Sequence, residues 1–189
     1  IQIPIYMPYL EPVAEEKISR KMDDDESIRV LFIGGAARRK GLPQVVDALR
    51  LVPKPIRDRL RLTVVSNFQD GPVQGVERVA EVLSNVSRAQ LSELFRCAHI
   101  FIFPTQFESY GRVVVEAMAN GCATISSNTD PQDWMLDFGK AGALVNPESV
   151  EDIAMELTKL AEKREYRLQL AISASRRFKN LFYHQVTGK

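Results

Sequence analysis

Cysteine and histidine are scarce in this chain of 189 residues, with two of each. Cys97 and Cys122 do not have the spacing of a zinc site or a disulfide framework, and we interpret them as small core residues. His99 and His184 form no metal-ligand motif such as H-E-x-x-H. We therefore expect no metal ion, and the cysteine usage favours a reducing, cytoplasmic setting.

Long apolar runs and a strong net charge are also lacking. No apolar run approaches the roughly 18 residues of a membrane span, so no transmembrane segment is expected. The formal net charge is +1, which favours neither nucleic acid nor an acidic membrane surface as a partner. The chain begins "IQIPIYMPYLEP" without a basic region before an apolar core, and we interpret this start as the interior of a larger protein.

From residue 29 onward, short apolar runs alternate with amphipathic stretches. Strands are predicted at 29–34, 60–66, 79–84, 99–103, 123–127 and 142–145. Helices are predicted at 42–52, 88–97, 111–120, 147–163 and 165–182, the second of them with a capping box formed by Ser87 and Gln90. This alternation indicates an α/β, Rossmann-like parallel sheet with helices on both faces.

The chain is expected to contain one folded domain. Residues 1–28 have prolines at positions 4, 8 and 12 and the charged run "DDDES", which we interpret as an entry or interdomain segment. Residues 29–189 then form the Rossmann-like domain. Ligands of parallel sheets bind beyond the carboxyl ends of the strands, so the loops 34–41 and 104–111 are the candidate site.

The first of these loops reads "GGAARRKGL" from Gly34. It fits neither the Walker A pattern nor G-x-G-x-x-G. Gly34 and Gly35 allow close backbone approach, while Arg39 and Lys40 supply cationic donors for a phosphate. The alternative is a basic turn that only faces water.

The second loop leads into a helix and reads "PTQFESYGRVVVE". A helix that begins near Gly111 offers unpaired amides to an anion. Glu116 lies about 7.5 Å further along the axis, at a place suited to the adjacent hydroxyls of a ribose. The alternatives are an exposed Arg112–Glu116 pair and, for Glu108, an ordinary loop carboxylate. Because both loops should meet at one sheet edge, the sequence predicts a nucleotide-sugar site.

The motifs resemble those of the C-terminal, donor-binding half of a GT-B fold retaining glycosyltransferase of family 4 (glycosyl transferases group 1), from residue 29 to about 180. The E-x7-E motif of that family matches Glu108 and Glu116, and its glycine-rich turn matches Gly34 through Gly41. Its "EAMAxG" run matches Glu116 through Gly121. The Gly-Gly loop that precedes a Pro-Glu in the family is replaced here by "NTDPQDW" at 128–134.

The resemblance implies a role for each matching position. Glu108 would contact the donor sugar, Glu116 the ribose hydroxyls, and Arg39 and Lys40 the diphosphate, with Glu108, Lys40 and Arg39 as the catalytic set. The full donor-binding set would be Gly34, Gly35, Asn85, Val86, Glu108, Ser109, Tyr110, Gly111, Arg112 and Glu116, in which Asn85 and Val86 face the base and the amides from Tyr110 to Arg112 assist at the distal phosphate.

The resemblance also implies partners and leaves alternatives open. The donor would be a UDP-, GDP- or ADP-sugar bound without a metal, and the acceptor a glycan or lipid-linked molecule held by an N-terminal domain that precedes this chain. The enzyme would work in the cytoplasm, either free or at the inner face of a membrane through that missing domain, and this chain alone would be inactive. A nucleotide-sugar 2-epimerase of similar fold is one alternative. A non-catalytic flavodoxin-like or receiver-like module is another, although it would require acidic residues where Gly34 stands.

Overall fold

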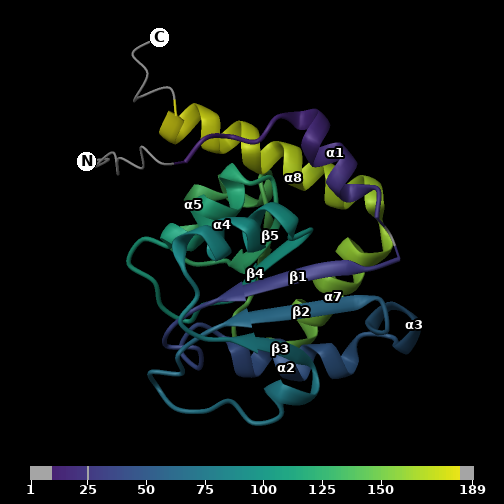
Figure 1. Cartoon of the computed structure of the whole chain (residues 1–189), viewed down its shortest axis with the longest axis vertical. Coiled ribbons are helices and arrows are strands. Elements are labelled where there is room, and N and C mark those ends of the chain that lie inside the picture. The colour runs from purple at the N-terminus through teal and green to yellow at the C-terminus, as the bar shows by residue number, and fades with distance from the viewer. Residues whose placement is uncertain (1–9, 25, 184–189) are drawn as a thin grey trace.

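A computed structural model describes residues 10–24 and 26–183 (Figure 1). Its described part contains one six-stranded sheet in the order β3-β2-β1-β4-β5-β6, and every neighbouring pair is parallel. The strands are β1 (Ile28–Ile33), β2 (Leu60–Val65), β3 (Ala80–Leu83), β4 (Ile100–Phe103), β5 (Ala123–Ser127) and β6 (Ala143–Val145). The predicted parallel α/β architecture is therefore confirmed.

Helices cover both faces of the sheet, as Figure 1 shows. Alternate residues of β1 enter different cores: Val30 and Phe32 pack in one cluster, Leu31 and Ile33 in the other. The first cluster includes buried residues of α2 (Leu42–Leu51), α3 (Lys54–Arg57) and α7 (Val150–Glu162). The second cluster includes buried residues of α4 (Arg88–Cys97), α5 (Arg112–Ala119) and α6 (Gln132–Met135). The helix α8 (Arg164–Phe178) contributes to both, and the short turns are η1 (Val76–Arg78), η2 (Asp137–Gly139) and η3 (Lys179–Tyr183).

The segment interpreted as an entry segment contains a helix that the sequence analysis did not predict. This helix, α1 (Glu15–Met22), buries Ile18 and Met22 completely and packs beside α8. A Cβ added to Gly121 would lie 2.5 Å from Ile18 Cδ1, so the segment fits closely against the turn before β5. The prolines at 4, 8 and 12 precede α1, which begins at Glu15. The first nine residues lie outside the described part.

The strands and most of the predicted helices follow the prediction closely, whereas the short helices α3 and α6 were not predicted. All six strands appear with ends shifted by at most one residue. The capping box is confirmed, because Ser87 Oγ accepts from the Gln90 amide at 3.2 Å and Gln90 Oε1 accepts from the Ser87 amide at 2.8 Å. The last predicted helix, 165–182, is instead α8 followed by the π-helical turn η3.

His99, just before β4, is fully buried and uses both ring nitrogens. The Arg29 amide donates to Nδ1 at 2.9 Å, and Nε2 lies 2.7 Å from the carbonyl oxygen of Lys21. The ring is therefore neutral, with its proton on Nε2. Burial, reinforced by the positive charge of Arg29, lowers the pKa of His99 from 6.5 to about 4.

Stability is expected to decline in acid because of His99. Its unfolded pKa of 6.5 exceeds the folded value of about 4, so the unfolded state binds the proton first. Stability that is present above pH 6.5 is lost as the pH falls toward 4, and the free energy of unfolding should drop by about 2 kcal/mol between pH 8 and pH 5. Urea unfolding of wild type and His99→Gln at both pH values measures this drop. A drop that is equally large in His99→Gln would assign the effect to another group.

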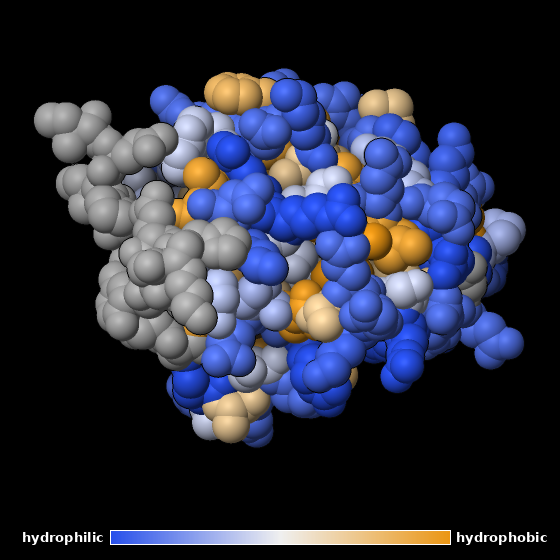
Figure 2. Space-filling model, turned by 90° about the horizontal axis from the view of Figure 1, so that it is seen from above, coloured by the Kyte–Doolittle hydropathy of each residue, from blue (hydrophilic) through white to orange (hydrophobic). Residues whose placement is uncertain are grey.

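The face of the molecule seen in Figure 2 is mainly hydrophilic. In Figure 2, which looks onto the side where α1 and α8 lie in Figure 1, hydrophobic side chains appear in small separate areas. Of the helices in the described part, none has both the length and the apolar character needed to cross a membrane.

Candidate functional site

The strand order reverses direction between β1 and β4, which pair with each other in the middle of the sheet. The crevice beyond the carboxyl ends of two such strands is the usual ligand site of an open parallel sheet. The segments that leave these ends are the loops 34–41 and 104–111, and the amide of Gln106 donates to the carbonyl of Arg39 at 3.2 Å between them. The structure thus brings together the two loops that the sequence predicted to meet.

The first loop is a tight turn held by backbone contacts. The amide of Gly34 donates to the Val65 carbonyl at 3.0 Å, and the Gly35 carbonyl accepts from Gln69 at 2.9 Å. A Cβ on Gly34 would lie 3.0 Å from Lys40 Cγ, so the glycine lets the lysine stem cross closely over the turn. The turn then passes through Gly41 into α2, whose second residue is a helix-starting proline.

Lys40 joins the two loops directly. Its Nζ donates to Glu108 Oε2 at 2.7 Å and to the Phe107 carbonyl at 3.3 Å. It also lies 5.5 Å from the ring centroid of Phe103, within the range of a cation–π contact. The side chains of Lys40 and Glu108 are only 13% and 16% exposed, so a cation and a carboxylate predicted for one ligand do lie side by side.

Glu108 is held in its ionised form. Burial raises the pKa of Glu108, but the hydrogen bond and charge of Lys40, together with the hydrogen bonds from the Tyr110 and Ser109 amides, lower it by more, and the net pKa lies below the usual value. Glu108 Oε1 accepts from the amides of Ser109 and Tyr110 at 2.9 and 3.3 Å. The alternative of an ordinary exposed loop carboxylate does not describe this side chain, which organises the turn that leads into α5.

The helix α5 begins on Gly111, which has φ = 80° and offers no side-chain cap. A Cβ there would lie 2.8 Å from the side-chain nitrogen of Gln132, from the "NTDPQDW" segment. Gln132 is completely buried, and neither end of its amide finds a hydrogen-bond partner among the described residues. An uncapped helix start with a buried polar group beside it is suited to a polar, anionic ligand.

Glu116, one turn into α5, is 5% exposed although it carries a carboxylate. Arg88, the first residue of α4, approaches it with 3.3 Å between Nη1 and Oε1. The alternative placed Glu116 on an exposed face beside Arg112, and that exposed face does not fit, because Glu116 is buried.

The other predicted site residues lie around this centre in different ways. Arg39 is exposed, and its guanidinium makes no hydrogen bond or ion pair with the residues that the structure describes. Its backbone amide instead donates to Asp70 Oδ2 at 2.8 Å. Asn85 is exposed with φ = 53°, and Val86 packs against the second core cluster, both just beyond the end of β3. Their roles toward a donor stay predictions.

Sequence reasoning missed two residues that shape the site. Asp70 accepts from the amides of Arg38 and Arg39 at 3.2 and 2.8 Å and so fixes the basic turn. The only sequence pattern at Asp70 is the Asp-Gly pair, which predicts a turn but does not indicate which groups the carboxylate binds. No sequence pattern indicates a role for Arg88, because its pairing with Glu116 depends on how α4 and α5 pack.

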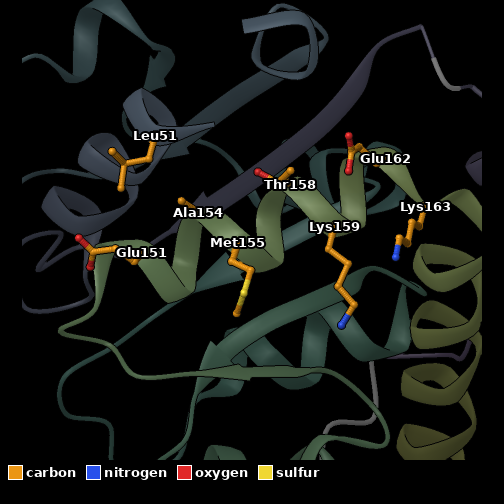
Figure 3. Close-up of a pocket in the computed structure, with 8 residues that line it drawn as sticks. All are labelled: Leu51, Glu151, Ala154, Met155, Thr158, Lys159, Glu162 and Lys163. Carbon is orange, nitrogen blue, oxygen red and sulfur yellow. The ribbon is translucent and has the colours of Figure 1, made fainter. Parts of the chain in front are cut away.

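No group of three or more His, Cys, Asp or Glu that could hold a metal occurs in the described part of the chain. A groove elsewhere, of about 500 Å³, runs along α7, with Leu51 reaching in from the end of α2 (Figure 3). None of its lining residues belongs to the loops 34–41 or 104–111. The site at the switch point is therefore distinct from this groove.

The chain matches the family model "Glycosyl transferases group 1" over residues 14–177. It belongs to this family. Among curated relatives, it is 26% identical over 160 residues to the D-inositol 3-phosphate glycosyltransferase of Nocardiopsis dassonvillei, covering 77% of this chain and 37% of that protein. It is 27% identical over 165 residues to the sulfoquinovosyl transferase SQD2 of Arabidopsis thaliana, covering 81% and 30%. The chain thus spans about a third of the length of these relatives.

Solved structures share the fold. The sucrose-phosphate synthase of Thermosynechococcus elongatus superposes with a TM-score of 0.78 at 22% identity over 98% of this chain and 48% of its own. Anabaena HepE in complex with UDP-glucose gives 0.72 at 19% identity, over 90% and 50%. The C-terminal domain of the group 1 glycosyl transferase LpcC from Francisella tularensis gives 0.72 at 18%, over 93% and 97%. The fold is that of one half of a GT-B glycosyltransferase.

Proposed function

We propose that this chain binds the nucleoside-diphosphate sugar donor of a glycosyltransferase and that an N-terminal domain supplies the acceptor, a glycan or a lipid-linked molecule. The observation that carries the proposal is the Lys40–Glu108 contact of 2.7 Å at the switch point, beside the uncapped start of α5. A cation and helix amides suit a diphosphate, and a carboxylate suits sugar hydroxyls. The UDP-glucose complex of Anabaena HepE supports this ligand class.

The arrangement also supports a division of work during transfer. The bond between the anomeric carbon and the diphosphate breaks, and the electron pair leaves with the diphosphate. Lys40 and the first amides of α5 stabilise the charge that develops there, while Glu108 orients the sugar. The acceptor hydroxyl would attack from the side that the diphosphate leaves, which gives retention, and would lose its proton to the departing diphosphate oxygen. Arg39, exposed at the rim of the turn, is assigned to the diphosphate in the same way.

The donor class is tested by thermal shift and calorimetry with UDP, GDP and ADP and one sugar conjugate of each. A ligand at 100 times its Kd should stabilise the fold by about 2.7 kcal/mol. Stabilisation by one nucleoside diphosphate and its conjugate supports the proposal. The absence of binding by all of them would overturn it and favour the non-catalytic module.

Glu108→Gln is expected to separate the sugar from the nucleotide. Binding of the free nucleoside diphosphate should change less than threefold, whereas affinity for the nucleotide sugar should fall roughly 10-fold, because hydrogen bonds to a charged acceptor contribute about 1.5 kcal/mol or more. Calorimetric titration with both ligands measures the two effects. Equal weakening of both ligands would place Glu108 at the diphosphate instead.

Donor binding is expected to be independent of divalent metal, since we assign to Lys40 and the α5 amides the diphosphate charge that other enzymes neutralise with a metal cation. The Kd for the preferred nucleoside diphosphate should stay within threefold when excess EDTA is added. A tenfold weaker Kd after chelation, restored by magnesium or manganese, would contradict this expectation.

A further inference from the structure

Arg88 lies where two parts of the proposed site meet. It is the first residue of α4 and follows the Asn85–Val86 loop, which is assigned to the base. The capping box of Ser87 and Gln90 fixes the backbone on either side of it. The backbone position from which its side chain extends is therefore set by the geometry of α4.

The contact between Arg88 and Glu116 is asymmetric. The Glu116 side chain is 7% exposed, whereas the Arg88 side chain is 58% exposed. The arginine keeps most of its hydration, so the pair avoids much of the desolvation cost of a fully buried ion pair. The carboxylate, by contrast, depends on partners from the protein to remain ionised and oriented. The desolvation cost of placing Arg88 beside Glu116 is therefore small, whereas the orientation of the Glu116 carboxylate depends on such contacts.

A carboxylate can accept from more than one partner at a time. An ionised carboxylate has about four lone-pair positions on two oxygens, and Arg88 approaches Oε1. Both residues line a cavity of about 160 Å³ between α4 and α5, where the wall is otherwise Leu10, Leu91, Ser92, Phe95 and Asn120. A carboxylate that contacts Arg88 in such a small space has few alternative orientations.

We propose that Arg88 is a positioning residue that orients the Glu116 carboxylate for the ribose and so determines how strongly the site prefers ribose to 2′-deoxyribose. This inference rests on the proposed donor site, in which Glu116 accepts from the ribose hydroxyls. Arg88 acts through Glu116, and its removal should matter only while the acid and the hydroxyls are both present.

The test compares UDP, GDP and ADP with their 2′-deoxy forms by calorimetric titration. Wild type should prefer the ribose form of its nucleotide roughly 10-fold, since a site built to hydrogen-bond a hydroxyl disfavours the analogue that lacks it. Arg88→Gln should reduce this preference to about threefold or less through weaker binding of the ribose form, and Arg88→Lys should restore part of it. When Glu116→Gln is already present, adding Arg88→Gln should not change the preference for ribose any further. Arg96→Gln, an exposed change on the same helix, is the matched control and should leave the preference intact.

The outcomes distinguish the inference from the function it rests on. If Glu116→Gln abolishes the preference while Arg88→Gln retains it, the positioning role is wrong and the donor site stands. If Arg88→Gln weakens ribose and deoxyribose forms equally, Arg88 acts on the fold or on another part of the nucleotide, and the inference is overturned. If wild type binds none of the nucleotides, both fail. Thermal unfolding of each variant is the control for a folding defect. A Tm close to that of wild type shows that the change in affinity does not come from misfolding.

Discussion

Replacing Glu116 by glutamine should weaken binding of the preferred nucleoside diphosphate by about 1.5–3 kcal/mol, or roughly 10- to 150-fold. The side chain keeps its shape and volume but loses the charge that makes it a strong acceptor for two hydroxyls. The amide also presents donors to hydroxyls that themselves need an acceptor. Calorimetric titration of wild type and Glu116→Gln with the same nucleotide measures the difference.

The stability of the Glu116→Gln variant should change little, because Arg88 is largely exposed. Losing the ion pair leaves an arginine whose side chain is 58% exposed, and water can solvate it. We therefore expect the free energy of unfolding to shift by less than about 1 kcal/mol. Unaltered affinity for a nucleotide that wild type binds would remove the assignment of Glu116 to the ribose.

The fold could be predicted from the sequence because its strands are short apolar runs between clear helix signals. In a parallel sheet both faces are buried, so strands such as "RVLFIG" are continuous apolar segments that stand out without an alignment. The helix α1 was missed because only Ile18 and Met22 among its eight residues are buried apolar positions. Its stability comes from packing beside α8, which local sequence does not reveal.

The site was predictable to the extent that it depends on connectivity. Parallel strands end at one edge, so Lys40 and Glu108 had to come near each other once both loops were recognised, and their 2.7 Å contact follows. The pairing of Arg88 with Glu116 depends instead on the relative rotation of two helices. Likewise, the direction of the Arg39 side chain is not fixed by its place next to Lys40, and the structure places it at the exposed rim.

Gly41→Ala should be the most destabilising single change at the site. Gly41 has φ = 85°, and a Cβ there would lie 2.1 Å from the carbonyl oxygen of Pro104 and 2.9 Å from its carbonyl carbon. A backbone carbonyl cannot move aside as the end of a flexible side chain can, so the two loops must separate. We expect a loss of about 3–5 kcal/mol in the free energy of unfolding, from the left-handed backbone conformation and the displaced loop together.

A second glycine separates these two contributions. Gly139 also has a left-handed conformation, with φ = 93°, but a Cβ added there meets nothing within 4 Å. Gly139→Ala should therefore cost only about 1–2 kcal/mol, the conformational part alone. Urea unfolding of both variants gives the difference, and calorimetry under conditions where Gly41→Ala stays folded gives its nucleotide affinity. If the two variants lose the same stability and Gly41→Ala binds nucleotide as wild type does, the close approach of the loops 34–41 and 104–111 is not what forms the site. A larger loss in Gly41→Ala, together with weaker nucleotide binding, would show that this backbone contact brings Lys40 to Glu108.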